Sequence, residues 1–235
     1  MVDLNILYVD DDLIVVDKPS GLLSIADGYH PSTTHLYGLL SNTFSELYIV
    51  HRLDKETSGV IIFARNKNAH RSLNQQFEKR LIKKYYLAWI AGRPEWNNYY
   101  IEIPLRVNGD RKHRTIPDKD NGKIAVTDIR VLEHDHQNTL VIAAPITGYT
   151  HQIRSHLAAI QYPILFDPLY NPEYKPVPGN TKIIPEKRLM LHAFLISLSH
   201  PSSGENLNFR SQIPKDFNEV TQDPNEILHQ FKNES

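Results

Sequence analysis

A polar segment that ends in glycine lies between two apolar runs, and it constrains the fold more than any other part of this sequence. Residues 47–50 and 60–64 are short apolar runs rich in β-branched and aromatic side chains, which predicts two buried strands. The nine residues between them, 51–59, read His-Arg-Leu-Asp-Lys-Glu-Thr-Ser-Gly and carry five ionisable side chains. We therefore expect a charged loop presented between two core strands.

The rest of the pattern predicts more strands than helices. Apolar runs at 6–9 and 13–16 flank three aspartates at 10–12, whose short polar side chains favour a tight turn, so a β-hairpin is expected there. Further strands are predicted at 85–91, 99–105, 124–132, 139–144, 189–199 and 207–213. Helices do not alternate one for one with strands, which favours an α+β fold with a largely antiparallel mixed sheet flanked by helices and loops.

Two helices are predicted from apolar periodicity. The first, of about four turns, is expected because apolar residues recur at every fourth position, namely Ala69, Leu73, Phe77 and Leu81. The second is expected to begin at a Thr150 cap and to bury Ile153, Leu157 and Ile160. His151 and Arg154 lie on its other face. Six prolines between 162 and 185 predict a loop, and a short helix is expected to close the chain.

Composition excludes some classes of chemistry. The chain has 235 residues, no cysteine and a formal net charge of −1, so thiol catalysis and disulfide scaffolds are excluded. No run approaches the roughly 20 apolar residues of a membrane span, and no signal peptide is present, so we expect a cytoplasmic protein. The near-neutral charge does not favour nucleic-acid binding by itself. Local basic runs lie at 79–80, 83–84 and 111–114.

Asp54 is the first candidate for chemistry in the loop at 51–59. Neighbouring cations favour the ionised form of a carboxyl group, and an ionised carboxylate can act as nucleophile, general base or metal ligand. The alternative is a polar turn in which the aspartate only binds backbone groups. Arg154 has the bidentate fork to pair with such a carboxylate, and its alternative is a structural ion pair.

Metal and nucleotide cofactors are not predicted. His151 and His156 are five residues apart, which does not match the four-residue spacing of two ligands on one helix face. His134 and His136 have no third ligand at an informative spacing. Glycine-rich dinucleotide motifs, phosphate loops and serine-hydrolase elbows are also absent from the sequence.

Five segments, in sequence order, resemble the motifs of the RluA-type family of pseudouridine synthases. They are Ile6-Leu7-Tyr8 through Lys18-Pro19-Ser20-Gly21-Leu22, the loop 51–59, Lys84-Tyr85-Tyr86-Leu87-Ala88, Thr147 through Arg154 with Pro163-Ile164 and Asp167, and Leu191-His192-Ala193 with His200-Pro201. The similarity extends over most of the chain. It implies an RNA-modifying isomerase that detaches uracil from its sugar, rotates it and rejoins it through carbon 5, without cofactor or metal.

The resemblance also implies roles for individual residues. Asp54 corresponds to the nucleophile, Arg154 to its ion-pair partner, Tyr86 to the aromatic residue against the base, and Arg52 to the side chain that enters the RNA stack. Whether the aspartate attacks the anomeric carbon or removes the neighbouring sugar proton stays open. Substrate contacts are further expected from other residues of the same motifs, namely His51, Thr57, Tyr149, His151, Gln152, Ile153 and Leu191.

The expected organisation is a single catalytic domain over 1–235, with room for two subdomains that share one sheet and enclose a cleft. No separate amino-terminal RNA-binding module is expected, and the protein is expected to be a monomer that acts on a stem-loop of rRNA or tRNA. One position departs from the family, which commonly has Arg where this chain has Tyr149. A tyrosine cannot neutralise a phosphate, so local RNA contacts or substrate choice are expected to differ.

Two alternative functions stay open. The first is an RNA-binding protein of the same fold without catalytic activity, to which Tyr149 is relevant. The second is an aspartate-dependent nucleoside or glycoside hydrolase. Such an enzyme normally uses two carboxyl groups, and only Glu56 is close to Asp54 in sequence.

Overall fold

The described residues of this computed structural model are 4–28, 32–175 and 188–217, and they form two compact units. The first unit contains residues up to Lys84 together with His192–Gln212, and the second contains Tyr85–Leu191 together with the residues after Gln212. Each unit has its own buried apolar residues, so each is described by itself.

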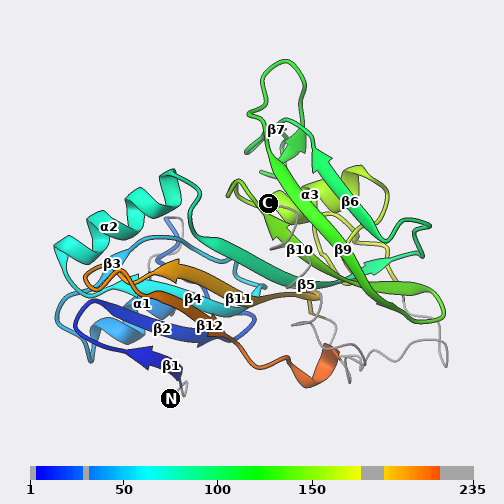
Figure 1. Ribbon diagram of the computed structural model, residues 1–235. Helices are drawn as coiled ribbons and strands as arrows, with labels where there is room; N and C mark the ends of the chain where they lie inside the picture. Colours follow the sequence, from blue (N-terminus) through cyan, green and yellow to red (C-terminus); the bar gives the residue numbers. More distant parts are fainter. Residues whose placement is uncertain (1–3, 29–31, 176–187, 218–235) are drawn as a thin grey trace. The chain divides into compact units, whose positions relative to one another are not determined.

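The first unit is built on a sheet with the order β1 (Asn5–Val9), β2 (Leu13–Lys18), β4 (Ser58–Ala64) and β11 (Leu191–Ser199), drawn side by side in Figure 1. The short strand β3 (Tyr48–Ile49) pairs with β4, and β12 (Asn206–Arg210) pairs with β11. All of these pairs are antiparallel except β4 with β11, which is parallel. The predicted amino-terminal hairpin is confirmed by the pairing of β1 with β2.

The two apolar runs around the charged loop differ in the structure. Every residue of β4 is buried, as predicted. The run at 47–50 forms only the two-residue strand β3, in which Ile49 is 39% exposed, so the prediction of a second fully buried strand was wrong. A strand that pairs on one edge with a buried neighbour can leave its outer face to solvent, which apolar composition alone does not reveal.

The first predicted helix is α2 (Lys67–Glu78), and it is shorter than expected. Asn66 caps its start by accepting a hydrogen bond from the Ala69 amide. The helix ends before Arg80, whose φ of 57° is left-handed, and Leu81 is 60% exposed. The inclusion of Leu81 in the buried stripe was therefore wrong, because the backbone turns away before that residue.

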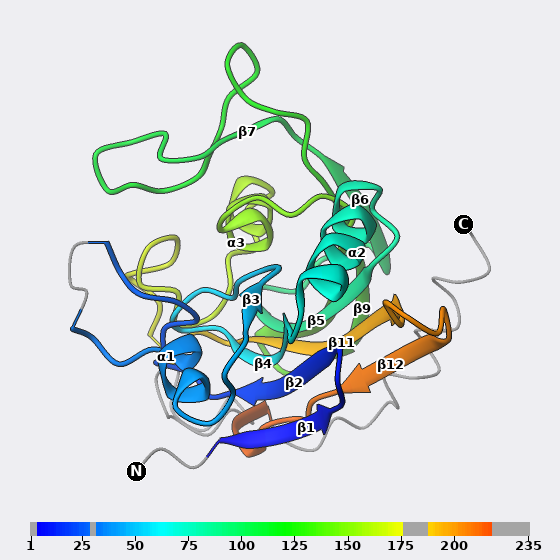
Figure 2. The same cartoon turned by 90° about the vertical axis from the view of Figure 1, so that its left-hand side faces the viewer.

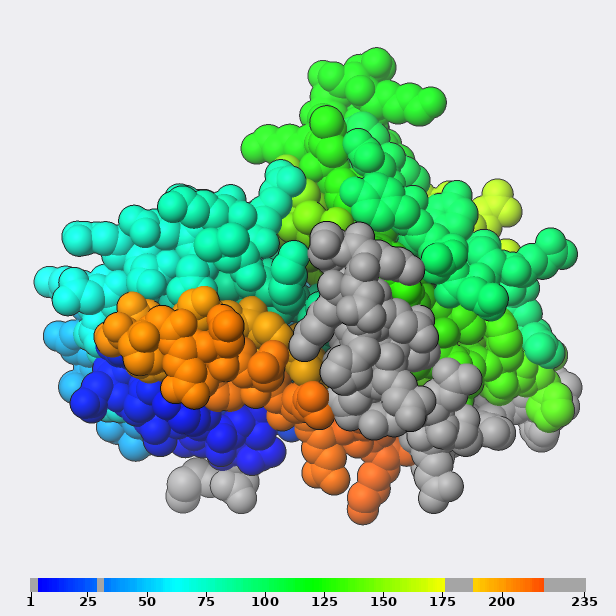
Figure 3. Space-filling view, viewed as in Figure 1, coloured from blue at the N-terminus to red at the C-terminus, as the bar shows by residue number. Residues whose placement is uncertain are grey.

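The Gln76 side chain ties helix α2 to the sheet. The Gln76 amide donates to the Ser199 carbonyl oxygen at 2.8 Å and accepts from the Ser199 amide at 3.0 Å. Figure 3 shows the β11–β12 segment, in orange, covering the surface between α2 and the blue amino-terminal hairpin. On that hairpin, Tyr8 packs against Phe209 of β12 with ring centroids 5.1 Å apart. A second helix, α1 (Leu36–Ser41), buries Leu36 and Leu40.

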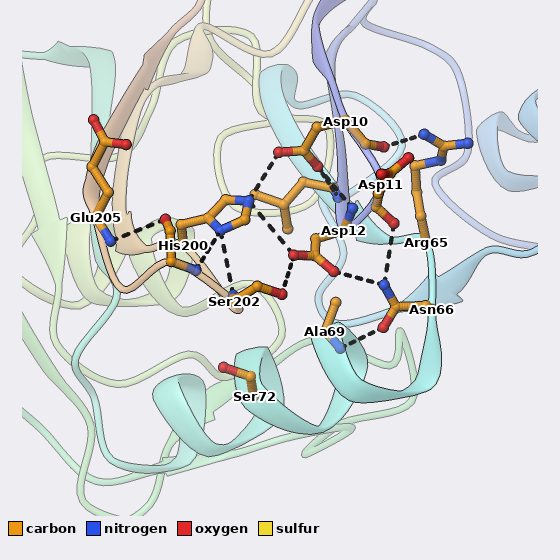
Figure 4. Close-up of polar contacts among 12 residues, drawn as sticks. Asp10, Asp11, Asp12, Arg65, Asn66, Ala69, Ser72, His200, Ser202 and Glu205 are labelled. Carbon is orange, nitrogen blue, oxygen red and sulfur yellow. Dashed lines mark hydrogen bonds and ion pairs between the residues drawn. The ribbon is translucent and has the colours of Figure 1, made fainter.

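The aspartate turn after β1 is joined to the turn between β11 and β12 (Figure 4). His200 lies 2.9 Å from an Asp10 carboxylate oxygen, and the Ser202 hydroxyl donates to Asp12. Asp12 also accepts from the Asn66 amide at the start of α2. Hydrogen bonds to ionised carboxylates are about twice as strong as neutral ones. His200 and Ser202 therefore fasten the two ends of the unit's sequence together.

The second unit contains an antiparallel sheet with the order β5 (Lys83–Ala91), β10 (Asn138–Pro145), β9 (Val126–His134) and β6 (Asn98–Glu102). A separate ribbon pairs β7 (Leu105–Arg106) with β8 (Ile116–Pro117). The loops beside β7 project from the unit in both views (Figures 1 and 2). The predicted strand at 99–105 is thus two short strands, since the chain leaves the sheet after Glu102.

Helix α3 (Gln152–Ala159) and the 3-10 turn η1 (Lys215–Phe217) complete the described part of this unit. Trp89 of β5 is fully buried, and its indole N–H donates to the Phe217 carbonyl oxygen at 3.3 Å. The predominance of antiparallel strands with few helices confirms the predicted α+β fold. The predicted closing helix lies in 218–235 and part of the proline-rich loop lies in 176–187, outside the described residues.

Gly59 provides a test of how the charged loop ends. Its φ is +111°, and a Cβ atom at this position would lie 2.2 Å from the Ala193 carbonyl oxygen. We expect Gly59→Ala to lower the free energy of unfolding by about 3 kcal/mol or more, because steric overlap adds to backbone strain. Urea denaturation measures this change.

Gly21→Ala is the matched control for that substitution. Gly21 also has a positive φ, +82°, but nothing lies within 4 Å of its Cβ position. It should lose only about 1 kcal/mol, the cost of the left-handed backbone. Equal losses in the two variants would contradict the close approach of β4 to β11.

Candidate functional site

The loop 51–59 is held in place by the segment that follows β2. Lys18, fully buried at the end of β2, donates from its ammonium group to the carbonyl oxygens of Pro19, Leu22 and Lys55 at 2.9, 2.7 and 3.1 Å. The Gly21 amide donates to the same Lys55 oxygen at 2.9 Å. A buried charge that meets several carbonyl dipoles is compensated, so the ammonium group ties the loop to the sheet.

Two serines of the same segment hold the loop on either side of Asp54. The Ser24 hydroxyl accepts from the Leu53 amide and donates to the Leu53 carbonyl oxygen, at 3.1 and 2.8 Å. The Ser20 hydroxyl donates to the Glu56 carbonyl oxygen at 2.7 Å. With the Thr57 amide donating to the Asp54 carbonyl oxygen at 3.1 Å, the backbone around Asp54 is fixed at almost every residue.

The side chains of the loop differ in their exposure. Arg52 is exposed and Asp54 is half-buried, so both can reach a ligand. Thr57 is buried, which places it among the residues that support the loop. Ser58 is also buried, and its hydroxyl lies 2.9 Å from the His192 ring nitrogen Nδ1. The loop thus presents its arginine and aspartate while its carboxyl end is anchored.

His51, the first residue of the loop, is half-buried and its ring is engaged within the unit. Its Nε2 accepts a hydrogen bond from the Ile62 amide at 3.0 Å, and its ring packs 5.1 Å from that of Phe77. Burial, followed by the nearby charge of Lys84, lowers the pKa of His51 to about 3. Burial likewise lowers the pKa of Lys84 to about 8. His51 is therefore neutral at physiological pH and supports β4, which argues against a direct RNA contact.

The remaining predicted site residues lie in the second unit. Tyr86 is a half-buried residue of β5 and is opposite Ala143 of β10 in the sheet. Leu191 and Ile153 are buried, at 4% and 6% exposure, so they offer little surface for a substrate. Tyr149 is half-buried, and its amide donates to the Gln152 side-chain oxygen at 3.1 Å.

Helix α3 begins differently from the prediction. Its amino-terminal cap is His151, in the left-handed conformation with a φ of 55° and no capping hydrogen bond from its side chain. The predicted cap at Thr150 was wrong, since the chain turns at His151. The Thr150 carbonyl oxygen instead accepts from the buried Thr115 hydroxyl at 2.7 Å. A non-glycine residue in this conformation costs about 1 kcal/mol or more, which persists where the surroundings enforce it.

Gln152 anchors the start of α3 from inside the unit. Its side chain is 3% exposed; the oxygen accepts from the Thr147 hydroxyl at 2.7 Å, and the amide nitrogen donates to Val126 and Thr127 at 2.8 and 2.9 Å. His156 continues the network by contacting the Thr127 hydroxyl at 2.9 Å. A buried amide whose groups are engaged internally orients the helix rather than contacting RNA.

Arg154 forms a buried, bidentate ion pair with Asp167. Its Nε and Nη2 donate to the two carboxylate oxygens, each at 2.8 Å, and the side chains are 4% and 0% exposed. Asp167 also accepts from the amides of Leu169 and Tyr170. This pairing fixes the plane of the guanidinium group. Asp167 belongs to one of the motifs in the sequence, but the motif did not predict this role.

The structure therefore assembles the predicted residues in two groups. His51, Arg52, Asp54 and Thr57 share the loop of the first unit, whereas Tyr86, Tyr149, His151, Gln152 and Arg154 belong to the second. The pairing of Asp54 with Arg154 stays a prediction. The sequence did not predict the supporting roles of Lys18, Ser24 and Asp167. Of these, only Lys18 gave a signal, because it is a lysine at the end of an apolar strand.

The described ranges contain no group of three or more His, Cys, Asp or Glu side chains arranged to hold a metal ion. Within the same ranges, no helix has the length and apolar character needed to cross a membrane.

Comparison with known proteins gives one consistent family. The model of the RNA pseudouridylate synthase family matches residues 12–159. The dual-specificity RNA pseudouridine synthase RluA of Escherichia coli strain K12 is 36% identical over 216 residues, which cover 91% of this chain and 94% of that protein. The ribosomal large subunit pseudouridine synthase D of Nitrosomonas europaea is 35% identical and covers 97% of this chain and 67% of its own length.

Solved structures agree with the sequence relatives. Human RNA pseudouridylate synthase domain containing 1 has a TM-score of 0.76 and 26% identity, covering 98% of this chain and 95% of its own. Human RNA pseudouridylate synthase domain containing 4 has a TM-score of 0.72 and 29% identity, covering 91% and 90%.

The depressed pKa of His51 predicts how stability depends on pH. Because the folded pKa, about 3, is below the usual 6.5, the unfolded chain binds the proton more readily, and stability falls as pH drops below 6.5. Between pH 7 and pH 5, His51 should cost the folded state about 2 kcal/mol. His51→Gln should lose correspondingly less stability over this interval in urea titrations. Parallel pH profiles for the two proteins would contradict the neutral, internal His51.

Proposed function

The chain belongs to the RNA pseudouridylate synthase family and isomerises uridine in RNA to pseudouridine, and we propose that Asp54 is the residue that carries out this reaction. The main support is the loop that bears Asp54, whose backbone is fixed by Lys18, Ser20 and Ser24 while Asp54 itself is only half-buried. A fixed backbone with an accessible reactive group is what precise attack requires.

The reaction is an isomerisation in which one bond breaks and one forms. The bond from uracil N1 to the anomeric carbon of ribose is broken, the base rotates, and carbon 5 forms the new bond to the same carbon. The hydrogen displaced from carbon 5 is lost to solvent and N1 gains a proton, so the overall composition does not change. Asp54 acts first, either by attacking the anomeric carbon or by removing the neighbouring sugar proton.

Arg154 is proposed to hold the Asp54 carboxylate ionised and oriented. Its support is rigidity: Asp167 engages Nε and Nη2, so the guanidinium plane is set before any substrate binds. A prearranged cation stabilises a developing negative charge without reorganising during the reaction. Tyr86 is proposed to stack against the uracil while it rotates, because a half-buried aromatic ring supplies a flat surface for a base.

Arg52 is proposed to fill the space left when the target uridine leaves its stack. Flipping a base costs a few kcal/mol, which a side chain inserted in its place partly offsets. Arg52 is exposed and two residues from Asp54, so it can enter the RNA stack while Asp54 reaches the flipped uridine. The proposed substrate is a stem-loop of rRNA or tRNA, where bases are accessible, and the proposed active form is a cytoplasmic monomer.

A hydrolase is the second candidate function, and one contact disfavours it. Hydrolysis would need a second carboxyl group beside Asp54, and Glu56 is the nearest in sequence. The Glu56 carboxylate lies 3.9 Å from the Lys55 ammonium group at the loop surface. An exposed side chain that contacts only its neighbour is not held in the fixed position that a general acid requires.

Asp54→Asn tests the assignment in RNA labelled with tritium at carbon 5 of uridine. The wild-type enzyme should release tritium to water, and the variant should lose at least about 1,000-fold in rate, because the nucleophile is absent. Glu56→Gln is the matched control and should keep nearly full activity. Unchanged tritium release from Asp54→Asn would refute the assignment, and release of free uracil by the wild type would favour the hydrolase.

A further inference from the structure

Tyr170 lies three residues after Asp167 and contacts Arg154 from a second direction. The Arg154 guanidinium carbon is 5.2 Å from the Tyr170 ring centroid, and that of Arg114 is 5.9 Å away. An aromatic ring attracts a cation placed over its face. Asp167 therefore holds the edge of the Arg154 guanidinium group, and Tyr170 holds its face.

The Tyr170 hydroxyl reaches a different part of the unit. It accepts from the Thr115 amide and donates to the Thr115 carbonyl oxygen, both at 2.9 Å, and it lies 3.3 Å from His151 Nδ1. A hydroxyl has one proton, and Thr115 receives it, so His151 must donate from Nδ1 to make its own contact. The hydroxyl thus joins Thr115 to the left-handed residue at which α3 begins.

Thr115 directly follows the loop that carries the basic run. The loop, residues 107–114, exposes Arg111, Lys112 and His113 to solvent. Its last residue, Arg114, pairs with Asp110 at 2.7 Å and donates from Nη1 to the Leu169 carbonyl oxygen at 3.1 Å. The exposed residues of the loop therefore offer positive charge, while its carboxyl end at Arg114 is fastened beside Tyr170. Exposed arginine and lysine side chains are the groups that bind RNA phosphates.

We propose that Tyr170 is a positioning residue that links the engagement of loop 107–114 with RNA phosphates to the orientation of Arg154. RNA phosphates that bind the exposed cations fix loop 107–114. The carboxyl end of this loop is held at Thr115 by the Tyr170 hydroxyl, and the Tyr170 ring fixes the guanidinium group of Arg154. The inference rests on the proposed role of Arg154 at Asp54. It adds a coupling between RNA binding and catalysis that the role itself does not require.

A double-mutant cycle tests the coupling. Tyr170→Phe keeps the ring and removes the hydroxyl, and Arg111→Ala with Lys112→Ala removes loop charge. Single-turnover rates of tritium release are measured at saturating enzyme on pooled tRNA and rRNA transcripts labelled at carbon 5 of uridine. We expect the loop variant to lower the rate about 10-fold in the wild-type background and less than about 2-fold in the Tyr170→Phe background.

A purely structural Tyr170 gives a different result. The two effects would then multiply, and multiplicative rates would overturn the proposal. Tyr174→Phe is the matched control, since the Tyr174 hydroxyl contacts Asn138 at 3.4 Å and its ring packs on Phe166. In that background the loop variant should keep its full effect. A reduced effect there would also count against Tyr170.

Two further measurements separate the possible failures. If Tyr170→Phe does not fold, as judged by circular dichroism, Arg114→Met takes its place in the cycle because it removes the contacts with Asp110, the Leu169 carbonyl oxygen and the Tyr170 ring that fasten the end of the loop. If Asp54→Asn or Arg154→Lys keeps full activity, the proposed function fails. If both lose activity while the cycle is multiplicative, only the coupling fails.

Discussion

The loop 51–59 depends on the contacts of the buried ammonium group of Lys18. It donates to three carbonyl oxygens, and one of these oxygens belongs to Lys55, next to Asp54. Removing this ammonium group would take a donor from each of these oxygens, and the Lys55 oxygen would keep the Gly21 amide. The loop can therefore be polar and still be rigid, because side chains of the segment after β2 bind its backbone and only some of its own side chains reach solvent.

The second unit uses a buried charge in the same way. Arg154 lies inside the protein, which is costly for an unpaired cation, and Asp167 with Tyr170 compensates that cost while fixing its direction. Gln152 then sets the start of the helix that carries it. Both halves of the proposed site are thus built from charged groups held by buried partners, an arrangement suited to electrostatic catalysis.

Much of the fold could be predicted from the sequence, and the proposed reactive residues come from the same reading. Periodicity predicted α2 and the major strands, and ordered motifs pointed to Asp54, Tyr86 and Arg154. Burial of individual side chains could not be predicted in this way. Ile49 and Leu81 fit apolar patterns but are exposed, because a pattern does not show where the chain turns away from the core.

The supporting residues were harder to predict for a related reason. Lys18, Asp167 and Tyr170 contact segments that are distant in sequence, and Asp167 and Tyr170 lie in a coil without regular periodicity. No local spacing of residues therefore predicts their roles. His151 shows the same limit at a helix end, where Thr150 fits the usual capping preference but the backbone adopts a left-handed turn one residue later. Such features depend on tertiary contacts that a linear pattern does not contain.

The parallel pairing of β4 with β11 has a consequence for the order in which this protein folds. Ser58 and Gly59 pair with His192 and Ala193, which are more than half the chain away, and most of the second unit, Tyr85–Leu191, is encoded between them. During synthesis the Asp54 loop emerges long before the strand that closes over its carboxyl end. Contacts of such long sequence separation form late and slowly. The proposed nucleophile thus reaches its final anchored state only after most of the chain has been translated, so activity should appear late in biosynthesis.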